Sequence, residues 1–197
     1  MTTLSELGRI VRLQIQRAAL KVGEKPHERY DPAELLAVPA LTLTAHGVAA
    51  DDPAGGRWLD VHHALHPQSR NFEGENALSL GFTAHYAAMR ARFGPLVADG
   101  CAGENIIVES ELAPDLAALA GGLVIHTSGG LVRLGAVQVA APCRPFTRYL
   151  RSGSGDDDTL KADLQFLNGG RRGFYAALAQ PEPALIAVGD RVSAVTA

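Results

Sequence analysis

The chain has 197 residues, a formal net charge of −3 at pH 7, and 47% hydrophobic against 20% charged residues. This length and composition are typical of a globular protein with a substantial core, and the acidic balance argues against a general nucleic-acid binder. No apolar run approaches the roughly 18 residues of a membrane-spanning helix and no secretory signal opens the chain, so we expect a cytoplasmic protein without a membrane partner.

Alternating apolar and polar residues predict strands near the start of the chain. Residues 8–16 and 41–44 alternate in this way, and each is expected to form a strand with one buried face. Between them, Asp31 followed by Pro32 is a typical helix start, because the aspartate can cap the helix and proline is favoured in its first turn. We expect a short helix here that Pro39 ends.

The polar, glycine-containing stretch 48–76 predicts a long loop with a short strand near 58–61. A loop of this length in a compact domain is often functional. It contains four potential zinc ligands, namely Asp60, His62, His63 and His66. Because Pro67 and the loop context disfavour the helical spacing that would put two histidines on one face, hydrogen-bonded loop histidines are the competing interpretation.

The clearest predicted helix spans residues 80–93. Ser79 can cap its start, and Gly94 followed by Pro95 ends it. Large apolar residues recur along it at helical spacing: Phe82, Tyr86, Met89 and Phe93. We interpret this stripe as core packing and not as a cofactor contact.

A glycine-punctuated turn at 99–103 is expected to lead into a β-branched strand at 106–108. A short helix at 114–119 follows, and residues 123–127 and 131–139 predict a hairpin.

The second strand of this hairpin leads to a cysteine. Its alternation slips at Gly135, which predicts a bulge. Pro142 prevents the strand from continuing and Pro145 is expected to stop the next residues from forming a regular element, so Cys143 is predicted at a strand end between two stiff prolines. Positive neighbours favour the thiolate form of a cysteine, which binds soft metals and attacks electrophiles. An inert, buried thiol is the competing interpretation, and with Cys101 as the other cysteine no disulfide framework is expected.

The last part of the chain predicts a linker at 152–158, a helix at 159–167 with a leucine face, and strands at 171–178 and 187–192. Short strands therefore dominate, and the chain shows neither an internal repeat nor a domain boundary. We predict a single, mainly-β domain with a few helices, folded as a closed or nearly closed barrel.

Polar residues near the cysteine form a candidate anion site. The arginines fall into two groups in the sequence, Arg144, Arg148 and Arg151 beside the thiol, and Arg171 and Arg172 after the last predicted helix. Brought together by the fold, they would form a pocket for phosphate or another planar anion; otherwise each is a solvated surface charge. Glu104 and Asn105 are either site residues or turn residues that hold the backbone.

The sequence lacks the GxGxxG, Walker, GxSxG and CxxC motifs, which disfavours nucleotide-binding, hydrolase-elbow and thioredoxin-like functions. Three other segments stand in a recognisable order: Gly100-Cys101-Ala102-Gly103-Glu104-Asn105 before a strand, Pro142-Cys143 after the next hairpin, and Arg172-Gly173-Phe174-Tyr175 near the end. Together they resemble the MOSC domain family, found at the C-terminal end of molybdenum-cofactor sulfurases and as standalone bacterial proteins. The resemblance covers about 8–195 and implies one mainly-β, barrel-like domain.

The resemblance also implies a site. Cys143 matches the cysteine that ligates the molybdenum of a pterin cofactor in characterised relatives, and Glu104 and Asn105 would belong to the same cofactor site. Arginines would hold the pterin phosphate, namely Arg144, Arg148, Arg171 and Arg172. The implied reaction is the reduction of small N-hydroxylated or N-oxide substrates. Because the chain carries no flavin or iron–sulfur motif, the expected partner is a separate electron-donor reductase, and no pyridoxal phosphate is expected.

Two other functions stay open. Cys143 is alternatively a non-catalytic persulfide carrier for the maturation of metal–sulfur cofactors, with no metal of its own. In the third interpretation the barrel is an interaction module whose thiol has no chemical role.

Overall fold

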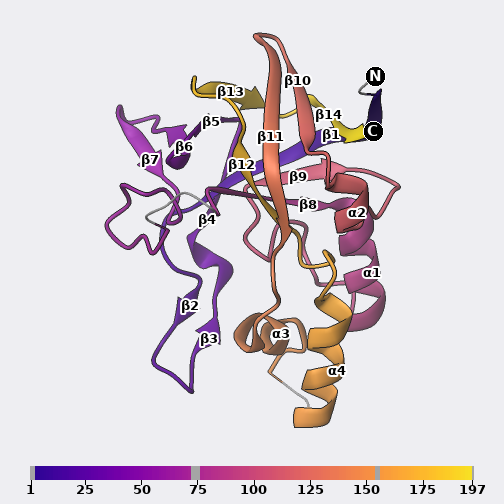
Figure 1. Cartoon of the computed structure of the whole chain (residues 1–197). Helices are drawn as coiled ribbons and strands as arrows, with labels where there is room; N and C mark the ends of the chain where they lie inside the picture. Colours follow the sequence, from indigo (N-terminus) through magenta and orange to yellow (C-terminus); the bar gives the residue numbers. More distant parts are fainter. Residues whose placement is uncertain (1–2, 72–75, 154–155, 197) are drawn as a thin grey trace.

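The computed structural model describes residues 3–71, 76–153 and 156–196. Within these residues, seven strands close into a barrel, so the predicted mainly-β barrel is confirmed. Figure 1 labels these strands and the helices of the chain. The ring runs β14 (Arg191–Thr196), β10 (Leu123–Thr127), β11 (Gly130–Val139), β12 (Phe174–Leu178), β8 (Leu78–Phe82), β9 (Ile106–Glu109) and β1 (Thr3–Gln16), which pairs again with β14. Strands β8 and β9 run parallel, and the other neighbours in the ring run antiparallel.

Strand β1 is longer than the predicted 8–16 because it pairs with three partners in succession. It contacts β14, then β9, and finally β4 (Leu35–Val38), with register shifts at Gly8 and after Ile10. A β-carbon at Gly8 would collide with the backbone of Glu109, so the glycine permits the close crossing of β1 and β9.

A smaller sheet lies beside the barrel; it contains the short strand predicted near 58–61, and it corrects the prediction that the loop begins at 48, because residues 48–51 belong to a strand. Its order is β13 (Ala184–Ala187), β5 (Ala40–Thr44), β6 (Gly47–Asp51) and β7 (Arg57–Leu59), and a separate hairpin joins β2 (Lys21–Val22) to β3 (Arg29–Tyr30). The first four residues of β6 are all buried, so this strand lacks the alternation that marks a strand with one exposed face. Part of the predicted loop, residues 72–75, lies outside the described residues.

Two predicted helices begin or end elsewhere because strand pairing takes their residues. The helix expected over 80–93 is α1 (Thr83–Phe93), and Ser79 lies in β8, where it does not cap a helix. The helix expected after Asp31 is a single 3-10 turn, η1 (Pro32–Glu34), after which the chain pairs with β1 as β4. Apolar runs alone do not separate a buried strand from a buried helix.

The residues after Cys143 form a helix, which corrects the prediction that Pro145 prevents regular structure. Helix α3 (Arg144–Leu150) has the proline in its first turn, where a missing N–H breaks no helical hydrogen bond, and Cys143 is its N-cap residue. Helix α4 (Asp157–Leu167) likewise begins before the predicted 159, because Asp156 caps it by accepting a hydrogen bond from the N–H of Thr159. Residues 154–155 of the predicted linker lie outside the described residues.

The hairpin of β10 and β11 is confirmed, including the bulge. The pairing of β11 with β12 shifts register between Gly135 and Gln138, and Ala136 has a positive φ of 50°. A helix predicted at 114–119 is the short α2 (Leu116–Leu119).

Two apolar clusters organise the packing. One fills the barrel, and the other lies between the barrel and α1, α3 and α4, where it includes Tyr30, Tyr86 and Phe146. Asp163 of α4 joins these helices, because its buried carboxylate accepts hydrogen bonds from Arg92 Nε of α1 at 2.7 Å and Arg151 Nη1, just after α3, at 2.6 Å. None of the helices in the described residues is both long and apolar enough to cross a membrane.

Candidate functional site

The candidate site is built around the turn 100–103. Each of its four carbonyl oxygens accepts a hydrogen bond from a different side chain. The pairs are Gln14 Nε2 to Gly100 at 2.8 Å, the Tyr30 hydroxyl to Cys101 at 2.8 Å, Arg172 Nη2 to Ala102 at 3.2 Å and Gln16 Nε2 to Gly103 at 2.7 Å. A β-carbon at Gly100 or Gly103 would lie within 3.0 Å of the capping glutamine, so the glycines are required for this close approach. The turn is therefore held by β1, β3 and the segment before β12.

Cys143 lies where β11 gives way to α3. Its side chain is half-buried and packs against the second apolar cluster, and Phe146 of α3 anchors the helix in that cluster. Cys101, in contrast, is buried in the turn, and burial raises the pKa of its thiol to about 12. Cys101 is therefore a protonated core residue, and Cys143 is the thiol that is accessible to a ligand.

Arg172 is the arginine that the structure brings to this thiol. Its guanidinium carbon lies 5.9 Å from the ring of Phe146, and its Nε atom is buried without a hydrogen-bond partner among the described residues. Burial lowers the pKa of Arg172, but the ionisable groups around it outweigh this effect and the net shift is upward; these groups are Tyr175, Glu104, Tyr30 and Cys143. The site thus places a permanent cation, with one donor unused, beside a soft thiol.

Glu104 lies beneath the same turn and is fully buried. One carboxyl oxygen, Oε2, accepts a hydrogen bond from the Tyr86 hydroxyl at 2.6 Å, and the other has no partner among the described residues. Burial raises the pKa of Glu104, and the Tyr86 hydroxyl and Arg172 oppose this shift only in part. A β-carbon at Gly81 or Gly173 would come within 3.2 Å of the glutamate side chain, which explains why glycine follows Arg172.

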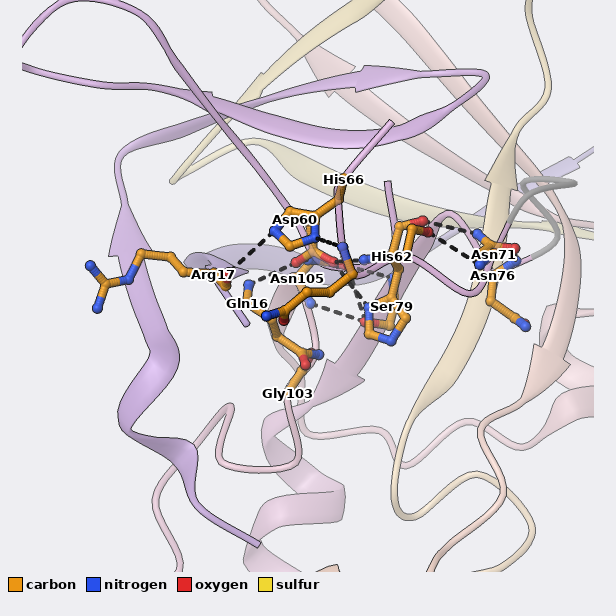
Figure 2. Close-up of polar contacts among 12 residues, drawn as sticks. Gln16, Arg17, Asp60, His62, His66, Asn71, Asn76, Ser79, Gly103 and Asn105 are labelled. Atoms are coloured by element: carbon orange, nitrogen blue, oxygen red, sulfur yellow. Dashed lines mark hydrogen bonds and ion pairs between the residues drawn. The ribbon is translucent and has the colours of Figure 1, made fainter. Parts of the chain in front are cut away.

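Asn105 serves the scaffold. Its Oδ1 accepts hydrogen bonds from the backbone N–H and the hydroxyl of Ser79, and its Nδ2 donates to the Gln14 carbonyl and to Asp60 Oδ2. The close-up in Figure 2 shows Asn105 between Asp60 and Ser79. Because all the hydrogen-bonding positions of its amide are taken by protein groups, the arrangement favours the interpretation that Asn105 holds the backbone.

The other predicted arginines do not share one pocket with Arg172. Arg171 lies over the ring of Phe166 at 4.8 Å and donates to the Phe166 carbonyl at 2.8 Å, on the side of α4. Arg151 binds Asp163, and Arg144 is exposed at the start of α3. Arg148 lines a cleft of about 320 Å³ between α3 and β3. The other residues that line this cleft are Glu28, Arg29, Tyr30, Pro145, Tyr149, Ser152 and Gly153.

The comparisons with known proteins identify the family. A family model described as the MOSC domain matches residues 62–193. The chain belongs to the MOSC domain family. No curated protein matched the sequence in the search.

Solved structures share the fold of this MOSC domain over its whole length. The YuaD protein of Bacillus subtilis superposes with a TM-score of 0.57 at 15% identity, covering 100% of this chain and 97% of that one. YiiM of Escherichia coli gives a TM-score of 0.50 at 14% identity, covering 96% of this chain and 70% of that one. YiiM of Geobacillus stearothermophilus gives 0.50 at 14% identity, covering 99% and 76%. The fold therefore extends to the strands that precede the matched segment.

In the histidine-containing turn of the MOSC domain, the described residues favour hydrogen-bonded loop histidines over the zinc interpretation. Among the described residues, no group of three or more His, Cys, Asp or Glu side chains is arranged to hold a metal ion. Asp60 is instead a buried anchor, and His63 is buried with a pKa lowered by desolvation.

Sequence reasoning did not single out Tyr30, and it named Asp60 only as a potential zinc ligand. Tyr30 packs its ring 5.0 Å from Phe146, in an edge-to-face arrangement, and caps the Cys101 carbonyl. Asp60 anchors Gln16 and Asn105. Each of the two residues contacts residues far away in the chain, so no local sequence pattern signals its role.

Proposed function

We propose that this MOSC domain binds the molybdenum cofactor through Cys143 and works as an oxidoreductase that reduces N-hydroxylated or N-oxide compounds. The family is associated with binding of this cofactor and with sulfur transfer. The observation that carries the proposal is the buried, unpartnered Nε of Arg172 beside the half-buried thiol of Cys143.

The residues present fit such a group. Molybdenum takes soft thiolate ligands, and Cys143 offers one at the edge of the apolar cluster. The cofactor is anionic, and Arg172 has a guanidinium N–H that no described protein group uses. The cleft beside α3 adds Arg148 and Arg29 next to the ring of Tyr149, which suits a phosphate attached to a planar ring system.

In this proposal Cys143 would ligate the metal, Arg172 would hold the nearest anionic group, and Arg148 would hold the phosphate. When bound, the cofactor supplies two-electron chemistry. The protein contributes the anchoring charges and excludes water on the side of Phe146 and Tyr30, which are buried. Burial raises the pKa of Glu104 and so favours its neutral form, which would repel an anionic cofactor less than a carboxylate would. Electrons would come from a separate reductase in the cytoplasm.

The test is the molybdenum content of purified protein from hosts able and unable to make the cofactor. Wild type from the competent host should contain the metal, Cys143→Ser should not, and the matched variant Cys101→Ser should retain it. With a chemical reductant, loaded protein should reduce hydroxylamine, whereas NADH without a reductase should support no turnover. Metal in Cys143→Ser, or turnover on NADH by the isolated chain, would contradict the proposal.

Metal-free wild type from the competent host would favour the sulfur-transfer alternative or the interaction module. Mass spectrometry of protein purified without reductant separates these two. A persulfide adds about 32 Da to the thiol and is lost on treatment with excess thiol. Such an adduct, present in Cys101→Ser and absent from Cys143→Ser, would assign sulfur carriage to Cys143.

A further inference from the structure

We infer that Arg92, Phe166 and Arg171 form the docking surface for the electron donor of this MOSC domain, and that the donor is a small electron-carrier protein with an acidic face. The inference rests on the proposed function, which requires electrons from outside the chain, and it names the surface that receives their carrier. The three residues, called here the arginine–phenylalanine surface, lie on α1, on α4 and in the turn before β12. Figure 1 shows α4 next to α1, and an ion pair joins the two helices.

Two guanidinium groups stack on the ring of Phe166. The guanidinium carbons of Arg92 and Arg171 each lie 4.8 Å from the centre of this ring. Phe93 extends the aromatic surface, because its ring lies 5.8 Å from that of Phe166 at an interplanar angle of 75°. Arginine that stacks on an aromatic face keeps its N–H groups at the edge of the stack, where they are available to carboxylates.

Each arginine is held in place by one hydrogen bond and keeps further donors. Arg92 donates from Nε to the carboxylate of Asp163 at 2.7 Å, and Arg171 donates from Nη1 to the Phe166 carbonyl at 2.8 Å. Within the described parts of the chain, the Nη atoms of Arg92 and the Nε and Nη2 atoms of Arg171 make no hydrogen bond, and both side chains are exposed. A guanidinium that is already fixed loses little freedom when it binds a carboxylate, so this surface is preorganised for an acidic partner.

The surface has an excess of positive charge. Helix α1 carries two arginines and no acidic residue. The carboxylate of Asp163, which pairs with Arg92, is 1% exposed and therefore lies beneath the surface, and Arg171 has no carboxylate partner among the described residues. The acidic residues of the first turn of α4 are about two helical turns away from Phe166. An acidic face complements this charge, which speeds association and fixes the orientation of the complex.

The arginine–phenylalanine surface adjoins the candidate site. Arg171 is followed directly by Arg172, whose guanidinium carbon lies 5.9 Å from the ring of Phe146. Phe166 and Cys143 pack against the same apolar cluster, the one between the barrel and the helices. Electron transfer, unlike proton transfer, requires no contact between the reacting atoms and passes through packed side chains. A carrier bound at this surface therefore faces the cluster on which the thiol lies.

The reaction needs repeated visits by the carrier. Reduction of R–NHOH to R–NH2 and water consumes two electrons and two protons: the N–O bond breaks, an N–H bond forms, and the oxygen leaves as water. Two molecules of a one-electron carrier are oxidised in each turnover, and both protons come from water. Such a carrier must leave quickly after each transfer, and electron-transfer complexes accordingly bury less than about 1,200 Å². A few fixed arginines around one aromatic ring suit an interface of this size.

The test uses a flavodoxin, a small acidic protein whose reduced flavin releases electrons one at a time. Its binding to metal-free protein is measured first, by titration calorimetry at low salt, so that the result does not depend on the cofactor. We expect Arg171→Gln to raise the Kd about 5–10-fold. The matched control Lys161→Gln, which removes an exposed cation from α4, should bind as wild type does. Added salt should weaken wild type more than Arg171→Gln.

Activity of the loaded protein gives the second measurement. With reduced methyl viologen, a small cation that needs no docking surface, Arg171→Gln should keep its molybdenum and reduce hydroxylamine at the wild-type rate. With reduced flavodoxin as the donor, its KM for flavodoxin should rise by the same 5–10-fold as the Kd. The two donors thus separate docking from the chemistry at Cys143.

Equal binding of flavodoxin by wild type and Arg171→Gln, or no binding by either, would overturn the inference and leave the proposed function in place. Binding of wild type to phosphatidylglycerol vesicles in preference to flavodoxin would assign the surface to a membrane and overturn it as well. A wild type that binds flavodoxin through Arg171 but contains no molybdenum and reduces nothing would confirm the docking surface and overturn the proposed function, together with the role in electron transfer.

Discussion

Asp163 is predicted to be the main polar support of the helices around the thiol. Its side chain is 1% exposed and receives two charged hydrogen bonds, from Arg92 at 2.7 Å and Arg151 at 2.6 Å. Breaking a buried pair by removing one partner costs about 3–5 kcal/mol. The two arginines are 39% and 26% exposed and regain some hydration, so we expect Asp163→Asn to lower the free energy of unfolding by about 2–4 kcal/mol.

For a chain of this size the loss corresponds to a decrease in Tm of about 5–15 °C, measurable by circular dichroism. The matched control is Asp158→Asn, an exposed residue in the first turn of the same helix, which should cost about 0.3–1 kcal/mol through the helix dipole. A loss below 1 kcal/mol for Asp163→Asn, or equal losses for the two variants, would refute the reasoning.

Three further variants test the frame of the site. Gly173→Ala should lower the free energy of unfolding by about 2–4 kcal/mol, because φ is +113° and the new β-carbon would lie 2.8 Å from a carbonyl oxygen of β8. The control is Gly55→Ala, where φ is also positive but the space is open, and it should cost about 1 kcal/mol in the same thermal assay. Asn105→Asp should cost about 3–5 kcal/mol, since it replaces a donor to Asp60 with a second buried carboxylate, and wild-type urea stability would contradict this. Glu104 has a folded-state pKa raised by burial, so its contribution to stability is complete below the unfolded value of about 4.3 and is lost as the pH rises through the folded value. Urea titrations should therefore show wild type losing stability relative to Glu104→Gln as the pH rises through that window, and parallel curves would show that the carboxyl does not titrate there.

The sequence predicts the barrel strands well where one face is buried, and less well where both are. The hairpin of β10 and β11 and its bulge follow from alternation and glycine placement, and both are found. In β6 and β8 nearly every residue is buried, so alternation disappears and these residues resemble a loop or a helix start. Pro145 shows a different limit, since proline ends one element and is equally suited to begin the next.

For the candidate site, the sequence offers residue types but not their geometry. Cys143 and Arg172 belong to motifs that stand out in the sequence, and the structure brings them together. Arg171 is adjacent to Arg172 and chemically identical, yet it packs on Phe166 while Arg172 reaches the turn. Both arginines lie in the turn between α4 and β12, where neighbouring side chains point in different directions, so a cluster of arginines in sequence does not establish a cluster in space.

The caps of the turn 100–103 explain why the geometry could not be deduced locally. Gln14 and Gln16 are on β1, Tyr30 is on β3, and Arg172 precedes β12, so every cap is 70 or more residues away in the chain from the carbonyl it holds. The glycines in the turn indicate that something approaches closely, but they do not identify it. Arg172 can reach the Ala102 carbonyl only when β12 has paired with β8 and β8 with β9, and the environment of Cys143 is therefore a product of barrel closure. Under the proposed function, a variant that loosens these pairings should therefore impair cofactor binding at Cys143, although every residue of the candidate site is still present.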